Sequence, residues 1–367
     1  MTIEQIVSVV RDPRNTKNQK YTLFELLLIV IASTISGYYD PDEMADFAKE
    51  KVSWLRKFST YDYGTPSHET LRYFLCAINP EHLIECFTRF VKESSFDFEN
   101  DVVSIDGKTM KGSGHNDSTD AIHIISAWSN SHGLTLAALE SKGKKNEIKT
   151  VPEVIDMLQV KNATITLDAM GCQKEICKKI INSGNQYVLQ IKDNQKNLLQ
   201  QVKAYHHILL RTNFENILYS EFETVEKSHG RIEHRKYTQF ELTDWVDVLD
   251  DWPGLKTAIH VSRSREIKGK VVTEESWYIS SRDPDAEKAS KAVRQHWGVE
   301  NQLHWRLDVI FEDDGCLMHS GFGPVNISLI KRFCMNLLTK DQSKKPTKKK
   351  IMRAAITDSY RERMLFG

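Results

Sequence analysis

The feature that most restricts the fold is an alternation of strand-like and helix-like segments between residues 101 and 192. Three β-branched, alternating segments come first, separated by short polar turns: VVSIDGKTM, AIHIISAWS and LTLAALES. This pattern predicts three consecutive antiparallel strands. A helix, a strand, a helix and a strand follow, in TVPEVIDMLQV, ATITLDAM, QKEICKKIINSG and NQYVLQIK. Because strand–helix–strand units place neighbouring strands in parallel, we predict an α/β fold with a mixed sheet flanked by helices.

The segments on either side of this alternation carry different patterns. Residues 1 to 100 have helical apolar spacing, and the short helix predicted after Ser67 is either a DNA-reading element or part of a plain helical bundle. Strand-like alternation returns from Tyr219 to Ser281. We therefore divide the chain into an all-helical N-terminal domain (1–100), the first part of an α/β core (101–218), a β-rich insertion (219–282), the rest of the core (283–340) and a basic C-terminal tail (341–367).

A single helix is predicted over Ala289–Asp314, and its polar residues recur with unusual regularity. Four of them form one slowly drifting stripe: His296, Glu300, His304 and Asp308. Trp297 and Trp305 lie beside that stripe, where packing in the core is a better explanation than stacking on a DNA base. A carboxylate flanked by imidazoles suits a functional site, but a partly buried helix with satisfied histidines fits the stripe equally well.

Two aspartates are candidates for chemistry: Asp106, in the middle of the first predicted strand, and Asp168, where a predicted strand gives way to a loop. Asp106 lies in VVSIDGKTM and Asp168 in TITLDAMG, while Glu300 would come from a helix packed on the same sheet. In open α/β sheets, functional residues gather at the carboxyl ends of strands. Three carboxylates can hold two Mg²⁺ ions, which together promote in-line displacement at phosphorus. A strand-terminal aspartate on its own is about as often a simple turn cap.

Several of these stretches resemble a known family. SIDGKTMKGS, ITLDAMGCQKEI, YVLQIKDNQKNL, HGRIEHR and RQHWGVENQLHWRLDVIFEDD are similar to DDE-type insertion-sequence transposases of the H-repeat-associated branch, and GTPSHETLRYFL resembles the associated N-terminal domain. The resemblance implies a ribonuclease-H-like catalytic core with a β-rich insertion before the last acid. It also implies cut-and-join chemistry on DNA ends with Mg²⁺, or Mn²⁺ as a substitute, and two ions bound together with DNA. By this resemblance Asp106, Asp168 and Glu300 are the catalytic and metal-binding acids.

Ten further residues are candidates for DNA contact: Lys108, Lys192, Asn194, Gln195, Arg231, Arg235, Arg294, His296, Asn301 and His304. The three that follow NQYVLQIK lie at the sheet edge expected to hold the acids, although a polar loop would look the same. The insertion arginines would grip the phosphate backbone. Lys108 either contacts a DNA phosphate or is a solvated strand residue on the pleat opposite Asp106.

Four functions fit these residues. A transposase would cleave element ends and join the freed 3′-hydroxyl to target DNA. A metal-dependent nuclease that cuts without joining would use the same acids. A zinc hydrolase using His296, Glu300 and His304 is disfavoured because the histidines lie about 12 Å apart by helical rise and HExxH spacing is absent. A non-catalytic, DNA-binding remnant of a mobile element is disfavoured because all three acids are present.

Overall composition restricts partners and compartment only weakly. The 50 basic and 50 acidic residues cancel, yet the stretch from Lys331 to Arg363 is locally basic and would add salt-sensitive affinity for DNA. Six cysteines without a CxxC pair favour reduced thiols. No signal peptide is apparent and the run Leu26 to Ala32 is too short to span a bilayer, so we expect a cytoplasmic protein with no membrane partner. Pairing of two DNA ends predicts a homo-oligomer during the reaction.

Overall fold

The computed structural model describes residues 3–15, 17, 19–114, 121–143, 146–228, 231–267 and 270–367. Its centre is a nine-stranded sheet with the strand order β3-β2-β1-β4-β5-β9-β8-β7-β6. The core strands are β1 Val102–Thr109, β2 His123–Ser129, β3 Leu134–Ser141, β4 Thr164–Leu167 and β5 Gln186–Ile191. Strand β1 is antiparallel to β2 and parallel to β4, which is parallel to β5. This is the ribonuclease-H-like mixed sheet that the resemblance implied.

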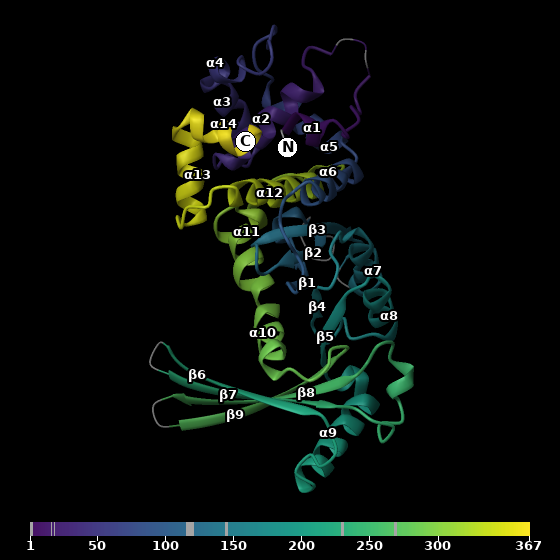
Figure 1. Ribbon diagram of the computed structural model, residues 1–367. Coiled ribbons are helices and arrows are strands. Elements are labelled where there is room, and N and C mark those ends of the chain that lie inside the picture. The colour runs from purple at the N-terminus through teal and green to yellow at the C-terminus, as the bar shows by residue number, and fades with distance from the viewer. Residues whose placement is uncertain are drawn as a thin grey trace.

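Helices cover both faces of the core strands. Figure 1 shows α7 (Glu147–Met157) and α8 (Lys174–Asn182) on one side and α10 (Ala286–His296) on the other. The helices contact different strands: α7 packs on β2 and β3, α8 on β5, and α10 on β1 and β4. Helix α10 therefore lies against the two strands that lead to the candidate aspartates.

The β-rich insertion extends the core sheet. Its strands are β6 Tyr219–Ser228, β7 Arg231–Glu241, β8 Thr257–Ile267 and β9 Lys270–Ser280. Strand β9 pairs antiparallel with β5, from Val188 opposite Ser280 to Ile191 opposite Trp277. The paired hairpins project well beyond the core, and α9 (Lys196–Arg211) packs beneath their base (Figure 1). The unpaired edge of β5 explains this continuity, because an exposed edge is satisfied by another strand.

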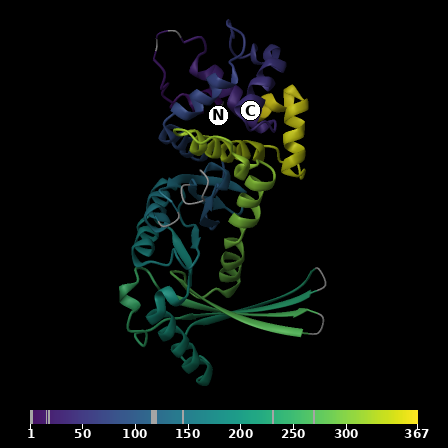
Figure 2. The same cartoon turned by 180° about the vertical axis from the view of Figure 1, so that it is seen from behind.

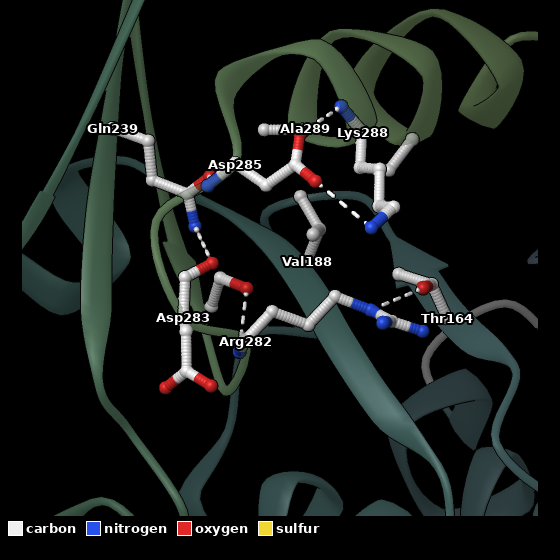
Figure 3. A pocket seen from close by; sticks show the side chains of 10 residues that line it. Thr164, Val188, Gln239, Arg282, Asp283, Asp285, Lys288 and Ala289 are labelled. Carbon is white, nitrogen blue, oxygen red and sulfur yellow. Dashed lines mark hydrogen bonds and ion pairs between the residues drawn. The ribbon is translucent and has the colours of Figure 1, made fainter. Parts of the chain in front are cut away.

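The insertion returns to the core at a polar junction that fixes the start of α10 (Figure 3). The Gln239 side-chain oxygen accepts the Asp285 N–H at 2.9 Å. Asp285 in turn caps α10 by accepting the Lys288 N–H at 3.0 Å. Arg282 donates from Nε to Thr164 Oγ1 on β4 at 2.8 Å. The insertion and β4 are thus both tied to the first turn of the helix that leads to Glu300.

The N-terminal region is helical, as predicted. Its helices are α1 Ile3–Val7, α2 Leu23–Ile35, α3 Pro41–Glu50, α4 Val52–Leu55, α5 His68–Ala77 and α6 Pro80–Lys92. Helix α5, expected after Ser67, packs against α2, α3 and α12 within this bundle. In the described ranges, no helix is both long enough and apolar enough to cross a bilayer.

Helix α12 (Gly323–Thr339) lies between the N-terminal helices and the sheet (Figures 1 and 2). The helix is buried on nearly every side, including its polar residues. Asn326 donates to the carbonyl oxygens of Leu75 and Ile78 at 2.7 and 2.8 Å. Asn336 accepts the Thr135 N–H and donates to the Thr135 carbonyl on β3. Polar residues on this helix satisfy backbone groups of both neighbouring layers.

The segment 341–367 was predicted as a basic tail, and the structure corrects this. It contains α13 (Thr347–Ile356) and α14 (Asp358–Phe366), and α14 docks on the N-terminal helices. Trp54 Nε1 donates to Glu362 at 2.9 Å, and the rings of Phe58 and Phe366 stack with centroids 4.3 Å apart. The many lysines led to the prediction of a tail, but the apolar residues between them are buried: Ile351, Ala354, Tyr360, Met364 and Leu365.

Candidate active site

Alternate residues of β1 face the helical run that follows the insertion. Ser104, Asp106 and Lys108 share one face of the strand, since side chains repeat every two residues. Ser104 Oγ donates to the Gln295 carbonyl at 3.0 Å. Asp106 lies 3.7 Å from His304 Nδ1, and Lys108 Nζ lies 2.7 Å from Asp308 Oδ1. The polar stripe predicted on the helix therefore lies along β1.

The helix predicted over Ala289–Asp314 is not continuous. Helix α10 ends at His296, a π-helical segment covers Val299–His304, and α11 covers Trp305–Val309. The Trp305 N–H bonds to the Glu300 carbonyl, five residues back. Single π-helical turns occur often at functional sites, and Glu300 lies within this one.

Gly298 lies where the helical geometry changes, and its lack of a side chain is required by packing. A Cβ at this position would overlap Oδ1 of Asn130, in the turn between β2 and β3. Asn130 cannot easily move, because its Nδ2 donates to the Val102 carbonyl and to Ser104 Oγ, both at 2.8 Å. Gly298 therefore allows the helix to approach the sheet closely.

Glu300 and Asp168 both lie within electrostatic range of Asp106. The Asp106 side chain is 22% exposed. Burial raises its pKa to about 7, against the opposing effect of the hydrogen bond from the Gly107 N–H. The carboxylates of Glu147, Glu300 and Asp168 raise the Asp106 pKa further by repulsion. The fold therefore brings together a strand acid, a loop acid and a helix acid that are far apart in the chain.

Asp168 follows β4 directly and begins a short, well-supported loop. Its Oδ1 accepts the Gly171 N–H at 3.1 Å. Two predicted DNA-contacting residues brace the loop: Asn194 donates to the Ala169 carbonyl at 2.6 Å and Gln195 to the Cys172 carbonyl at 2.9 Å. They lie at the predicted sheet edge, and in this structure they position the Asp168 loop.

The three acids offer carboxylate oxygens, which are the type of ligand that a hard divalent cation prefers. Within the part of the chain that the structure describes, neither Asp168 nor Glu300 forms an ion pair. The nearest basic group to Asp106 is His304, which stays neutral because burial, followed by the charges of Arg332 and Lys108, lowers its pKa to about 3. Carboxylate oxygens are the preferred ligands of Mg²⁺.

The side chains are, however, too far apart to form a complete metal site. No three His, Cys, Asp or Glu side chains of the described ranges lie close enough to hold one ion. The histidines of the zinc hypothesis point to different strands: His296 Nδ1 lies 3.3 Å from Thr166 Oγ1 on β4, whereas His304 faces Asp106 on β1. The donor set thus favours Mg²⁺ over zinc, and a shared ion would require the acids to approach one another.

Three of the predicted DNA-contacting residues point into the protein. His296 and His304 face the sheet, as described above. Lys108 is only 6% exposed, and its ammonium already pairs with Asp308 at 2.7 Å and Asp314 at 2.9 Å. It shares the face of Asp106, so the expected opposite pleat was wrong. Because these charges are already satisfied, Lys108 is no longer a candidate for phosphate contact.

Arg235, Arg294 and Asn301 line a groove between the insertion and the helical run. The groove has a volume of about 520 Å³ and also includes Trp297. Arg235 and Arg294 both pair with Glu226, at 3.2 and 3.0 Å. Lys192 is exposed, while the side chain of Arg231 lies outside the described residues. Arg235, Arg294 and Asn301 thus line one polar groove, and Asn301 directly follows Glu300 in the chain.

The prediction that the two tryptophans pack in the core was wrong. Trp297 is 55% exposed and Trp305 52% exposed, on either side of the Glu300 turn. The apolar contacts are instead made by Val299, Leu303 and Leu307, which are buried. An α-helical projection misplaces the indoles because the π-helical segment changes the angle between successive residues.

Sequence reasoning missed a buried pair beside Asp106. His123 Nε2 lies 3.2 Å from Glu147 Oε2, and the other ring nitrogen of His123 lies 2.9 Å from Thr109 Oγ1. Glu147 is in the first turn of α7, where an acidic residue is common, so its position carried no distinct signal. Only the tertiary structure brings it near the candidate acids.

Comparison with known proteins identifies the family. The family described as Transposase DDE domain matches residues 97–317, which include all three acids, and the family described as DDE_Tnp_1-associated matches residues 5–91. The chain belongs to the DDE transposase family. The H repeat-associated protein YhhI and the protein YbfL, both of Escherichia coli (strain K12), are each 34% identical over 98% of this chain and 97% of their own. The resemblance read from the sequence is confirmed.

Two more distant relatives complete the comparison. The protein named Inactive transposase YbfQ, from the same strain, is 26% identical over 18% of this chain and 77% of its own length. A piggyBac transposase synaptic complex with hairpin DNA superposes with a TM-score of 0.48 and 10% identity, covering 98% of this DDE transposase chain and 78% of that chain.

Proposed function

We propose that this DDE transposase cleaves DNA at the ends of a mobile element and transfers the freed 3′-hydroxyl into target DNA. The observation that carries the proposal is the convergence of Asp106, Asp168 and Glu300, whose mutual repulsion contributes to the raised pKa of Asp106. Membership in the family and the coverage of all three acids by the family match support the same assignment.

The three carboxylates would hold Mg²⁺, with Mn²⁺ as a substitute. When bound, two such ions would activate the attacking oxygen and stabilise the leaving oxygen during displacement at phosphorus. Asp106 must lose its proton to act as a ligand, and a pKa of about 7 allows this near neutral pH. Its burial strengthens attraction to a cation, because the surroundings are less polarisable than water.

The groove beside Glu300 would take the DNA strand that enters the site. Arg294, which is exposed, would exchange its contact with Glu226 for a backbone phosphate, whereas Arg235 is only 13% exposed and also pairs with the buried Glu233. Trp297, half exposed in the same groove, offers a surface on which a base can stack. Two DNA ends must be brought together for transposition, so we also propose that the chain acts as a homo-oligomer.

The test is a cleavage and strand-transfer assay with DNA carrying the element ends. Glu300→Gln and Asp168→Asn should abolish both products in Mg²⁺ and in Mn²⁺. Glu287→Gln is the matched control, since Glu287 lies on α10, pairs only with Lys291 and is well exposed. Product formation by Glu300→Gln at the wild-type rate would refute the proposed chemistry.

A second arm separates a transposase from a nuclease that only cuts. Supplying a DNA end that already carries a free 3′-hydroxyl bypasses the first step. Joined product is expected from the wild-type protein. Cleavage of intact ends without joining of the pre-cleaved end would instead assign a metal-dependent nuclease.

A further inference from the structure

An ionic cluster with buried cations lies directly beside the candidate site and has no part in the proposed chemistry. Its centre is Lys108, whose Nζ lies 2.7 Å from Asp308, 2.9 Å from Asp314 and 3.9 Å from Asp313. Lys108 is two residues beyond Asp106 on the same face of β1. Asp308 belongs to α11, which continues from the turn that carries Glu300. One ammonium group therefore joins the strand of Asp106 to the helical run of Glu300.

The cluster also reaches the layer beneath the sheet. Asp313 lies 3.6 Å from Arg332 Nη1 on α12, and Arg332 Nε donates to Ser126 Oγ at 3.2 Å. Ser126 is the residue opposite Asp106 in the β1–β2 register. The buried cations Lys108, Lys331 and Arg332 face the acids Asp308, Asp313 and Asp314. Asp313 is buried, while the side chains of Asp308 and Asp314 are 39% and 30% exposed, so each buried ion has a partner of opposite charge.

The far end of the cluster is held by close backbone packing. The Lys111 N–H donates to Asp314 Oδ1 at 3.2 Å. A Cβ on Gly112 would overlap the Asp314 backbone carbonyl, so the turn after β1 lies directly on the segment after α11. The residues on both sides of Lys108 are thus fixed, and the Lys108–Asp308 contact sets where α11 lies along β1.

We infer that Lys108 is a positioning residue, which sets the distance between Glu300 and Asp106 and thereby the affinity of the acids for a divalent ion. The inference rests on the proposed function, because it assumes that these acids bind the ion. Residues that orient metal ligands without touching the metal typically change metal affinity about 10–100-fold when they are removed. The same range is expected for the loss of the Lys108–Asp308 contact.

The direction in which Lys108→Met changes the affinity for a divalent ion distinguishes a positioning role from a purely electrostatic one. Lys108→Met removes a positive charge near the acids, so electrostatics alone predicts tighter binding of a cation. Loss of position predicts weaker binding. Lys111→Met is the matched control, since Lys111 also pairs with Asp314, at 3.6 Å, but its side chain is 80% exposed, whereas Lys108 pairs with Asp308 of α11.

The experiment is calorimetric titration of Mn²⁺ into the full chain, with DNA binding measured in parallel. Lys108→Met should weaken Mn²⁺ binding about 10–100-fold, while Lys111→Met should match the wild type and neither should change affinity for DNA. Asp308→Asn and Asp314→Asn form a second pair for the case in which Lys108→Met does not fold. They remove the same charge, but only Asp308 lies on the helical run, so only Asp308→Asn should weaken Mn²⁺ binding strongly.

Two outcomes would overturn the inference. In the first, Lys108→Met binds Mn²⁺ as tightly as the wild type or more tightly; in the second, Asp308→Asn and Asp314→Asn weaken binding equally. Glu300→Gln separates this failure from failure of the proposed function. If Glu300→Gln weakens Mn²⁺ binding but Lys108→Met does not, only the positioning role is wrong. If Glu300→Gln has no effect either, the acids do not bind the ion and both proposals fail.

Discussion

Neutralising Asp106 should make the protein more stable at alkaline pH, although the residue is proposed to be essential for activity. Burial raises the pKa of Asp106 from 3.8 to about 7. Between these two values the folded chain holds a proton that the unfolded chain has lost. The stabilisation is therefore fully present below pH 3.8 and is lost as the pH rises through 7. Asp106→Asn removes this dependence because an amide does not titrate.

The expected size follows from the pKa difference. A change of about three pKa units corresponds to roughly 4 kcal/mol at 1.36 kcal/mol per unit. Because the side chain is 22% exposed, solvent screening reduces this to roughly 2–4 kcal/mol. The entropy of unfolding is about 2.1 cal/mol/K per residue, or roughly 0.8 kcal/mol/K for this chain, so the change in Tm is about 3–5 °C.

The assay is calorimetric melting of the wild type and Asp106→Asn in EDTA between pH 5 and pH 8. From pH 5 upward only about two of the three pKa units remain, so the variant should gain about 2–3 °C in Tm relative to the wild type between pH 5 and pH 8. Glu287→Gln serves as the control for general loss of an acid, since Glu287 is exposed on α10. A Tm difference between variant and wild type that stays constant from pH 5 to pH 8 would refute the reasoning. Saturating Mn²⁺ should restore stability at pH 8 in the wild type only.

Four other changes test how the site and the helices around it are built. Gly298→Ala introduces a Cβ that overlaps Asn130, so it should cost about 1–3 kcal/mol in denaturant unfolding; an unchanged midpoint would contradict the close approach. Trp297→Ala should alter stability by less than about 0.5 kcal/mol yet weaken binding of single-stranded DNA, whereas buried Leu303→Ala should cost about 2–5 kcal/mol. Deleting 358–367 should lower Tm, since α14 docks on the N-terminal helices; a solvated tail would leave Tm unchanged.

Residue periodicity and short motifs in the sequence were sufficient to predict the strands and helices of the core. The alternation from 101 to 192 predicted the five core strands and the helices α7 and α8, because side-chain periodicity reports which face of an element is buried. The candidate acids were also found in this way, since Asp106 lies within β1, Asp168 directly follows β4, and the motifs around both match the family. Their roles as catalytic and metal-binding residues remain predictions, as does the division into domains.

Only the tertiary structure decided how the elements meet. The pairing of Lys108 with Asp314 joins residues 206 positions apart, and no local period encodes such a contact. Trp297 and Trp305 are exposed because the helix contains a π-helical turn between them. Gly298 lets this part of the helix pack closely against Asn130, a contact that the regular spacing of an α-helix does not predict. Local sequence determined which residues prefer to be buried or charged, whereas packing between distant segments determined which of those charges are satisfied and which remain available for chemistry.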